Sequence, residues 1–202
     1  MKILLVSDEE SPALWDYFDP ARMAGVDLIL SAGDLKAEYL SFLVTMLNRP
    51  LLYVHGNHDG GYDRRPPEGC QCVDDQIVTA GGLRILGLGG SPKYNDGPYQ
   101  FTEGQMNRRV QKARLRAALS GEPDIILTHA PIRGVGDQDS PTHRGFQCFR
   151  PLVENCAPRF FIHGHIHRRY AFDFRRVRVC GATTVINASG YYILDTDAPP
   201  VP

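Results

Sequence analysis

The apolar residues of this chain fall into short uninterrupted runs rather than into alternating patterns. Five such runs, each of three or four residues, occur at positions 3–6, 28–30, 51–54, 125–127 and 160–162. A run without polar interruptions is typical of a strand that is covered on both faces, as in the parallel sheets of α/β proteins. The pattern therefore predicts an α/β fold built around buried strands.

Between these runs, apolar residues recur at the spacing of amphipathic helices. Helices are expected at about 11–18, 36–47, 102–119 and 146–156. The third opens with Thr102 and Gln105, which is the pattern of a capping box. Residues 76–79 and 83–88 predict a hairpin, and runs at 171–174, 177–180, 183–187 and 191–194 indicate a closing antiparallel sheet.

Residue types that bind metals or move protons directly follow the apolar runs. These clusters are Asp8-Glu9-Glu10, Gly33-Asp34, Gly56-Asn57-His58-Asp59, Thr128-His129 and Gly164-His165-Ile166-His167. Because parallel strands end at the same edge of a sheet, we expect these carboxylates, amide and imidazoles to meet at that edge. The sequence therefore predicts a metal site there.

Each cluster taken alone has an ordinary structural explanation. Asp8 is placed to cap a helix, and Asp34 and Asn57 both follow a glycine, as residues in turns often do. His129 alone fits a loop histidine with a hydrogen-bond partner. Only the Gly-His-Ile-His segment suggests neighbouring metals by itself. The ordered series of five clusters makes the metal site the stronger interpretation.

Composition narrows the setting. The chain has 202 residues, of which 43% are hydrophobic, and we expect a single domain over 1–196 with a loose tail at 197–202. A formal net charge of −1 makes no demand for nucleic acid or an anionic membrane. No run approaches the ~20 apolar residues of a membrane span, so a cytoplasmic location without membrane contact is expected. The five cysteines are irregularly spaced, which favours reduced thiols.

The ordered clusters resemble the sequence blocks of the calcineurin-like metallophosphoesterases, in particular small bacterial members. Those blocks run Asp-x-His, Gly-Asp, Gly-Asn-His-Asp/Glu, a lone His and Gly-His-x-His, and the resemblance extends from residue 2 to about 194. It implies a four-layer α/β sandwich, with two central mixed sheets flanked by helices, and two divalent metal ions. It assigns Asp34 to both metals, Asp8, His167 and the residue at position 10 to the first metal, and Asn57, His129 and His165 to the second. This mixture of oxygen and imidazole ligands suits manganese, iron or zinc better than calcium.

Position 10 departs from the family pattern, because it holds glutamate where the family usually has histidine. On an extended chain, residues i and i+2 share a face, which selects Glu10 rather than Glu9 as the partner of Asp8. With Asp8 and Asp34, Glu10 sets three carboxylates against two divalent cations. We therefore expect a less electropositive site that prefers a harder metal at the first position.

The same resemblance implies roles at the substrate. His58 is expected to lie beside the substrate and to donate a proton to the leaving oxygen or stabilise developing charge, rather than to bind metal. Asp59 is expected to orient the His58 imidazole, with a loop cap as the alternative, and Asn57 is expected to contact substrate as well as metal. His143 and Arg144, in a long polar loop, are candidates for the substrate phosphate, with a plain surface loop as the alternative.

Two further histidines and one loop lie near the motifs. His55 and His163 each precede a motif glycine, and both are expected to be core residues with a hydrogen-bond partner. The irregular loop at 89–95 resembles a segment of related small phosphoesterases, and we expect it to form part of the substrate rim.

These features predict a dinuclear metal-dependent phosphoesterase in which a water that bridges the metals attacks phosphorus directly. The compact size favours a phosphodiester or a small phosphomonoester as substrate. One alternative is a catalytically weak metal-binding scaffold that acts through a protein partner, which Glu10 suggests. Another is a nuclease, supported only by arginines at 108–116 and 168–178. Because no aromatic residues are interleaved with the first group, a solvated helical face is its preferred explanation.

Overall fold

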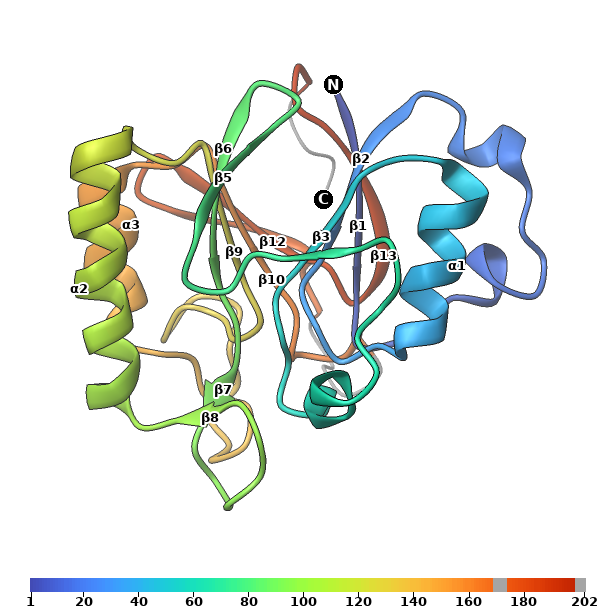
Figure 1. Ribbon diagram of the computed structural model, residues 1–202. Helices are drawn as coiled ribbons and strands as arrows, with labels where there is room; N and C mark the ends of the chain where they lie inside the picture. Colours follow the sequence, from blue (N-terminus) through green and yellow to red (C-terminus); the bar gives the residue numbers. More distant parts are fainter. Residues whose placement is uncertain (169–173, 199–202) are drawn as a thin grey trace.

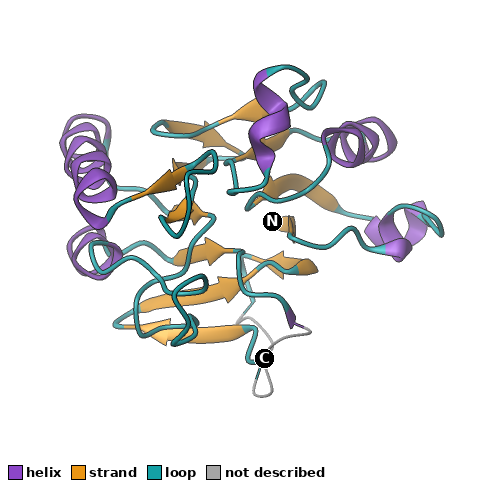
Figure 2. Ribbon diagram, turned by 90° about the horizontal axis from the view of Figure 1, so that it is seen from below, coloured by secondary structure: helices purple, strands orange, loops and turns teal. Residues whose placement is uncertain are grey.

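The computed structural model describes residues 1–168 and 174–198. Two mixed sheets lie face to face at its centre, and helices cover the outer face of each sheet (Figure 1). Seen from below, the strands form the middle layers and helices stand on both sides (Figure 2). The predicted four-layer α/β sandwich is therefore confirmed.

The first sheet has five strands in the order β13-β1-β2-β3-β4. Strands β1 to β4 run parallel, and β13 closes the sheet antiparallel to β1. The strands β1, β2 and β3 contain the first three apolar runs of the sequence. The bounds are Gly190–Asp195 (β13), Lys2–Ser7 (β1), Val26–Ser31 (β2), Leu51–Tyr53 (β3) and Gln71–Cys72 (β4).

The second sheet has six strands in the order β11-β12-β10-β9-β6-β5. The four inner strands run parallel, and the edge strands β11 and β5 are antiparallel to their neighbours. The bounds are Val177–Cys180 (β11), Thr183–Asn187 (β12), Phe160–His163 (β10), Ile125–Thr128 (β9), Leu83–Leu88 (β6) and Ile77–Ala80 (β5). The pair β5–β6 is the predicted hairpin. A small separate sheet joins Ser91–Pro92 (β7) to Gln100–Phe101 (β8).

The helices are divided between the two outer layers. Helix α1, Ala37–Leu47, packs on the first sheet, while α2, Glu103–Ser120, and α3, Phe149–Cys156, pack on the second (Figure 1). The predicted capping box of α2 is present, because the Thr102 hydroxyl accepts the N–H of Gln105 and the Gln105 side chain accepts the N–H of Thr102. Three short 3-10 turns are Pro12–Leu14 (η1), Pro20–Met23 (η2) and Asp59–Asp63 (η3).

The uninterrupted apolar runs are explained by burial on both faces of the parallel strands. On β1, Leu5 belongs to the apolar layer between the two sheets, whereas its neighbour Leu4 belongs to the layer under α1. A third layer lies under α2 and α3 and contains Phe149 and Met106. The central residues of each inner parallel strand are therefore apolar on both faces, and polar residues such as Asp27 and Ser31 of β2 lie near the two ends of a strand.

Several boundaries differ from those expected. The helix expected at 11–18 is only the turn η1, and Ser11 makes no side-chain bond that would cap a longer helix. Helix α3 begins three residues later than expected, because Phe146 forms a β-bridge with Ile132.

The strand expected at 171–174 lies almost entirely outside the described residues, as do residues 199–202 of the expected tail. Within the tail, the carboxylate of Asp197 contacts the amino group of Met1 at 2.6 Å. None of the helices in the described part of the chain is long and apolar enough to cross a membrane.

Candidate metal centre

The predicted ligands lie where parallel strands of both sheets end. Asp8, Asp34 and Asn57 follow β1, β2 and β3 of the first sheet, while His129 and His165 follow β9 and β10 of the second. A direct contact joins the two groups, because His129 Nδ1 is 2.7 Å from the backbone carbonyl oxygen of Ala32, just after β2. The two sheets thus supply residues to one site.

The most buried part of this site is a group of three side chains around His129. Nε2 of His129 lies 3.1 Å from Oδ1 of Asn57 and 3.1 Å from Nδ1 of His165. The carboxylate oxygen Oδ2 of Asp34 is 3.4 Å from the same nitrogen. Four possible ligand atoms therefore converge in a volume the size of one coordination sphere.

Outer contacts fix which atoms carry protons. Nδ1 of His129 donates to the carbonyl of Ala32, and Nε2 of His165 lies 2.7 Å from the carbonyl of Thr142, to which it donates. A neutral imidazole that donates through one nitrogen presents a lone pair on the other. The amide nitrogen of Asn57 donates to the hydroxyl of Tyr94 at 3.0 Å, which turns its oxygen inward.

The donor set therefore fits a divalent metal ion. When His129 is neutral, lone pairs of His129, His165 and Asn57 face one another with no donor between them. A positive charge stabilises this arrangement, which three acceptors alone cannot stabilise. Nitrogen and oxygen ligands of this kind suit manganese, iron or zinc. Asp34, His129 and His165 also form one of two groups of three ligand-type residues among the described residues.

The electrostatics of the cluster agree with a site for positive charge. Burial lowers the pKa of His129, but the carboxylate of Asp34 outweighs burial and raises it to about 9. Burial raises the pKa of Asp34, but His129 outweighs this effect and lowers it to about 2. Burial and the charge of His129 lower the pKa of His165 to about 3. A proton on Nε2 of His129 and a metal ion would therefore compete for the same position in the cluster.

Asp8 forms the second part of the site. Its carboxylate accepts the backbone N–H of His165 at 2.9 and 3.0 Å and the hydroxyl of Ser7 at 2.6 Å. Burial raises the pKa of Asp8 above its usual value. His167 lies on this side and is 29% exposed. The contact between Asp8 and His165 joins the two parts.

Three of the predicted ligands have strained backbones. The φ angles of Asp8, Asp34 and His165 are 63°, 58° and 68°, in the left-handed region that residues with a Cβ seldom adopt. Such strain persists only where the surroundings enforce it, and it is concentrated at functional sites. Its presence at three of the predicted ligands supports a functional reason for their placement.

Two motif glycines allow the backbone to approach the ligands. A Cβ atom at Gly56 would collide with the carboxylate of Asp34, and one at Gly164 would collide with the hydroxyl of Ser7 and crowd Asp8. These glycines are therefore needed for close approach, which explains why each stands directly before the ligand-bearing residues of its motif.

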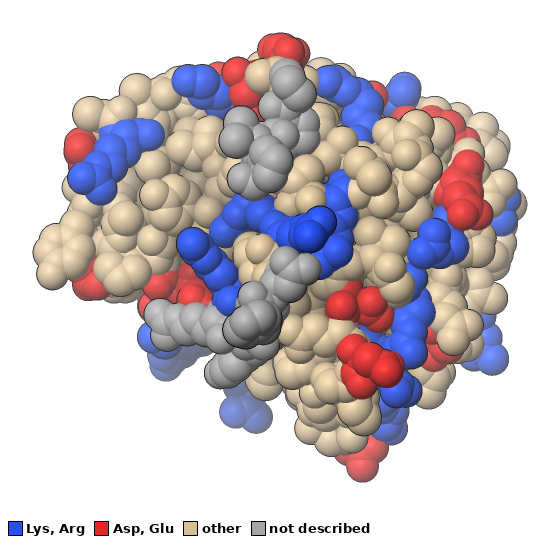
Figure 3. Space-filling model, turned by 180° about the vertical axis from the view of Figure 1, so that it is seen from behind, with Lys and Arg blue, Asp and Glu red and all other residues tan. Residues whose placement is uncertain are grey.

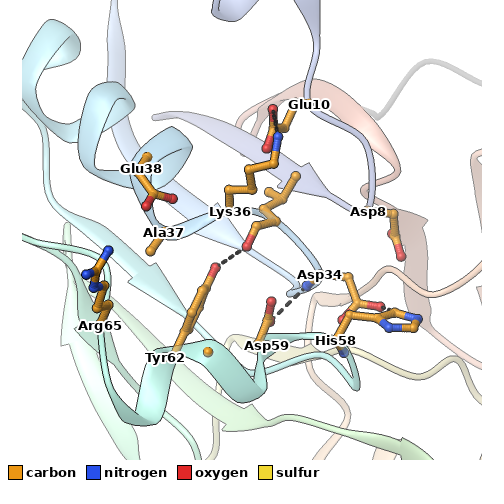
Figure 4. Close-up of a pocket in the computed structure, with 12 residues that line it drawn as sticks. Asp8, Glu10, Asp34, Lys36, Ala37, Glu38, His58, Asp59, Tyr62 and Arg65 are labelled. Carbon is orange, nitrogen blue, oxygen red and sulfur yellow. Dashed lines mark hydrogen bonds and ion pairs between the residues drawn. The ribbon is translucent and has the colours of Figure 1, made fainter.

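The two glutamates after Asp8 have different partners. Oε2 of Glu10 is 3.4 Å from Nζ of Lys36, whereas Oε1 of Glu9 is 3.5 Å from Nδ1 of His167. The preference for Glu10 assumed an extended chain, and the left-handed conformation of Asp8 breaks that alternation. The structure thus brings Glu9 next to a predicted ligand and places Glu10 with Lys36, apart from Asp8 (Figure 4).

His58 and Asp59 have separate environments. The backbone N–H of His58 donates to Asp34 at 2.8 Å, and its imidazole Nε2 lies 3.9 Å from Asp34 Oδ2, with the side chain 74% exposed. The Asp59 carboxylate accepts the backbone N–H groups of Gly56 and Asp34 at 2.7 and 2.9 Å, as in the loop-cap alternative. Burial raises the pKa of Asp59 to about 6. Asp59 thus fixes the loop that carries His58.

A cleft of about 620 Å³ opens beside Asp34. Its walls include His58, Lys36, Tyr62 and Arg65, which surround the hollow in Figure 4. The cleft therefore provides free space on the His58 side of Asp34, and basic side chains together with carboxylates such as Glu10 and Glu38 line that space.

Of the two predicted phosphate contacts, His143 lies nearer to the metal centre than Arg144 does. The ring centroid of His143 is 5.8 Å from that of His165, and its Nδ1 lies 2.8 Å from the hydroxyl of Ser140. Burial lowers the pKa of His143. Arg144 is paired with the exposed Asp139 at 3.3 Å. The loop thus brings His143 to the edge of the centre, while Arg144 lies on the surface.

Sequence reasoning did not identify Tyr94 or the pairing of His55. Tyr94 holds Asn57, and its only signal in the sequence was the loop at 89–95, which was expected as a rim. His55 Nδ1 lies 2.7 Å from Asp74 Oδ2 and 3.7 Å from Cys72 Sγ, and these form the second ligand-type group. The expected hydrogen-bond partner is confirmed for His55, and also for His163, whose Nδ1 is 2.9 Å from the carbonyl of Gly164.

The arginine clusters are partly used inside the molecule. Arg109 of α2 is only 14% exposed and binds Asp75 and the carbonyl of Gly89, so the predicted solvated face does not include it. Arg176 donates to the carbonyls of Asn187 and Ser189. Basic and acidic side chains are interspersed on the face shown in Figure 3. Arg169, in the second cluster, lies outside the described residues.

Two sheets in a four-layer sandwich, with carboxylates and imidazoles at the strand ends, define the class of protein as a metallophosphoesterase fold. The model of the family "Calcineurin-like phosphoesterase" matches residues 1–169. The chain therefore belongs to this family.

Individual relatives are more distant. UPF0046 protein K07C11.7 of Caenorhabditis elegans is 27% identical over an alignment of 196 residues. The match covers 81% of this chain and 62% of that protein. The chain thus spans less than two thirds of the length of this curated relative. One crystal structure is 14% identical with a TM-score of 0.70, covering 97% of this chain and 95% of its own. The protein TT1561 of Thermus thermophilus is 16% identical with a TM-score of 0.60, covering 94% and 89%. At these identities the two structures support the fold alone.

Proposed function

We propose that the protein is a metal-dependent phosphoesterase that hydrolyses a phosphodiester or a small phosphomonoester. The observation that supports this most directly is the convergence of lone pairs on His129, His165 and Asn57 beside the carboxylate of Asp34. A divalent cation satisfies acceptors that face one another in this way. The adjoining cleft gives a substrate access to the same atoms.

The proposed ligands form two positions that share Asp34. The buried position has Asn57, His129 and His165, and the other has Asp8, His167 and Glu9, with Glu10 as the alternative acid. Two divalent cations, with manganese, iron or zinc as candidates, would neutralise charge on the phosphoryl oxygens and lower the pKa of the attacking water. The proposed reaction is direct attack of water on phosphorus, without a covalent enzyme intermediate.

His58 is the proposed catalytic acid. It lies on the cleft wall, and its backbone N–H bond to Asp34 ties it to the proposed bridging ligand. From this place its exposed imidazole is able to donate a proton to the leaving oxygen. Asp59 is a positioning residue in this proposal, because its carboxylate holds the backbone of the loop on both sides of His58.

The test starts from metal-depleted protein. Manganese, iron and zinc are restored separately, and a chromogenic phosphodiester, a phosphomonoester and a short oligonucleotide are assayed. We expect hydrolysis of the diester or the monoester only after metal is restored. No turnover of any substrate with any metal would contradict the proposal and favour the scaffold alternative, and a strong preference for the oligonucleotide would favour the nuclease. The cytoplasmic location stays a prediction.

The variant His58→Ala tests the catalytic step. We expect kcat to fall by roughly 10²–10⁴-fold while metal content stays at the wild-type level, because the imidazole is not among the proposed ligands. Since the side chain is exposed, added imidazole is expected to restore part of the rate. An unchanged kcat, or a parallel loss of metal, would remove His58 from the proposed role.

A further inference from the structure

A second hollow adjoins the catalytic cleft on the side of α1. It has a volume of about 840 Å³ and shares Ala37, Glu38 and Arg65 with the cleft. Trp15 and Phe42 lie on its walls. The cleft that opens at Asp34 and His58 and this larger hollow are therefore neighbours, with the three shared residues on the walls of both.

The second hollow lies along α1. Its walls include residues of α1 from Ala37 to Thr45, and eight residues of α-helix correspond to about 12 Å. Ala37 also lines the cleft that contains His58. A phosphate bound at the metal centre would lie in the cleft, so the neighbouring hollow is available to a group attached to the phosphate.

An aromatic side chain is held in place in the hollow. The ring of Trp15 packs against Phe42 at a centroid distance of 4.9 Å and against Tyr39 at 5.4 Å. Trp15 is half-buried and lines the hollow. Its neighbours fix the ring orientation before any ligand arrives, which lowers the entropy cost of stacking against it. A fixed indole of this kind favours a flat ring as its ligand.

The charged groups around the hollow include two arginines that could contact an anionic group. Arg64 and Arg65 are exposed, and neither has an ion-pair partner within residues 1–168 and 174–198. Lys36 stands at the cleft side, paired with Glu10. Glu38 and Glu68 balance the charge of the two arginines, so the lining carries both signs, which suits a ligand that combines a flat polar ring with an anionic link.

We propose that this hollow binds the leaving-group part of the substrate, and that this part carries a flat hydrogen-bonding ring, as a nucleoside does. The inference rests on the proposed function, because His58 as donor to the leaving oxygen directs the leaving group into the cleft. The ring would stack on Trp15, and Arg64 and Arg65 would face the linking atoms.

Trp15 is the single tryptophan of the chain, so its fluorescence reports on the hollow directly. Protein with and without manganese is titrated with a nucleoside monophosphate and with the ribose phosphate that lacks the base. We expect saturable quenching by the first ligand and none by the second. The variant Tyr17→Leu, which changes a 76% exposed ring close by that does not line the hollow, is expected to quench as the wild type does.

Three variants measure the contribution of each group by equilibrium dialysis. Trp15→Leu is expected to weaken binding of the nucleoside monophosphate on the order of tenfold, with little change for the ribose phosphate. Because Trp15→Leu also removes core contacts, Arg64→Gln and Arg65→Gln provide a second test on exposed residues. We expect them to weaken both ligands severalfold in a salt-dependent manner.

The outcomes separate this inference from the proposed function. Equal quenching by both ligands, or none by either, overturns the ring-binding hollow even if diesters are hydrolysed. Base-dependent quenching in the wild type, together with weaker binding to Trp15→Leu and the arginine variants in dialysis, supports it even if no phosphoester is turned over, in which case the proposed function fails alone.

Discussion

The two halves of the candidate metal centre differ in how far the protein fixes them. In the half around His129, the side chains of His129, Asn57 and His165 are at most 6% exposed, and each is held by an outer hydrogen bond. In the other half, His167 and Glu9 are 29% and 27% exposed and lie 3.5 Å apart. One half is a buried set of lone pairs, and the other contains two partly exposed side chains.

The difference indicates that the two metal positions would not be equivalent. A rigid ligand set binds its ion without an ordering cost, whereas exposed side chains lose rotamer freedom when they bind. We therefore expect the buried position to fill first and to retain its metal longer. The exposed half would then set the dependence of activity on added metal.

The largest effect is expected for His129→Ala, and His167→Ala is the variant with which it is compared. Loss of His129 removes the nitrogen around which the buried ligands converge, and it leaves Asp34 without its charged partner. We expect the tightly held metal to be lost, with affinity reduced by more than the ~10–100-fold typical of outer residues. Metal content after gel filtration and hydrolysis of the best substrate measure this effect.

In His167→Ala, the buried metal is expected to stay and the second equivalent to become loose. Activity should then recover when excess metal is added, which it should not do in His129→Ala. If both variants lose the same amount of metal and recover alike, the two halves are equivalent and the comparison fails.

The next effect in size concerns Gly164, which joins the two halves. A methyl group in Gly164→Ala would be forced against Ser7 and Asp8, so we expect the free energy of unfolding to fall by about 1–3 kcal/mol and the metal affinity to fall as well. The control is Gly104→Ala in α2, where an added Cβ meets nothing within 4 Å. That variant is expected to gain up to about 1 kcal/mol. Thermal unfolding of both variants measures these two changes in stability.

The strand positions and the ligand types were predictable from the sequence for a physical reason. Strands buried on both faces exclude polar residues until they end, so β1, β2, β3, β9 and β10 appear as apolar runs with chemistry directly after them. The outer hydrogen bonds were not predictable in the same way. The carbonyls of Ala32 and Thr142 belong to backbone, which has no sequence signature, and Tyr94 is brought to Asn57 from a loop 37 positions away.

Position 10 shows where the sequence argument fails. The rule that i and i+2 share a face holds only for an extended chain, and Asp8 has a φ of 63°. Aspartate is among the few residues that tolerate this conformation, but the sequence gives no sign that it is adopted here. The direction of Glu9 and Glu10 therefore depends on tertiary contacts of Asp8 with Ser7 and His165.

A third prediction compares Glu9→Gln with Glu10→Gln. Because Glu9 contacts His167, its neutral variant is expected to weaken the exposed metal position by roughly tenfold, the lower end of effects seen for residues around a metal. Glu10→Gln removes an ion pair with Lys36, which is 75% exposed, so an effect below about twofold is expected. Manganese titrations of activity compare the two. A larger effect of Glu10→Gln than of Glu9→Gln would instead identify Glu10 as the ligand.

The smallest effect is expected at the loop that carries His143 and Arg144. His143 lies beside His165 and is partly buried, so in His143→Ala we expect KM to rise a few-fold while kcat and metal content change little. Arg144 forms an ion pair with the exposed Asp139, and Arg144→Gln is expected to leave KM within the error of the assay. A larger rise in KM for Arg144→Gln than for His143→Ala would show that the surface arginine turns toward the substrate phosphate. The exposed half of the centre would then extend further along this loop than its contacts in the free protein indicate.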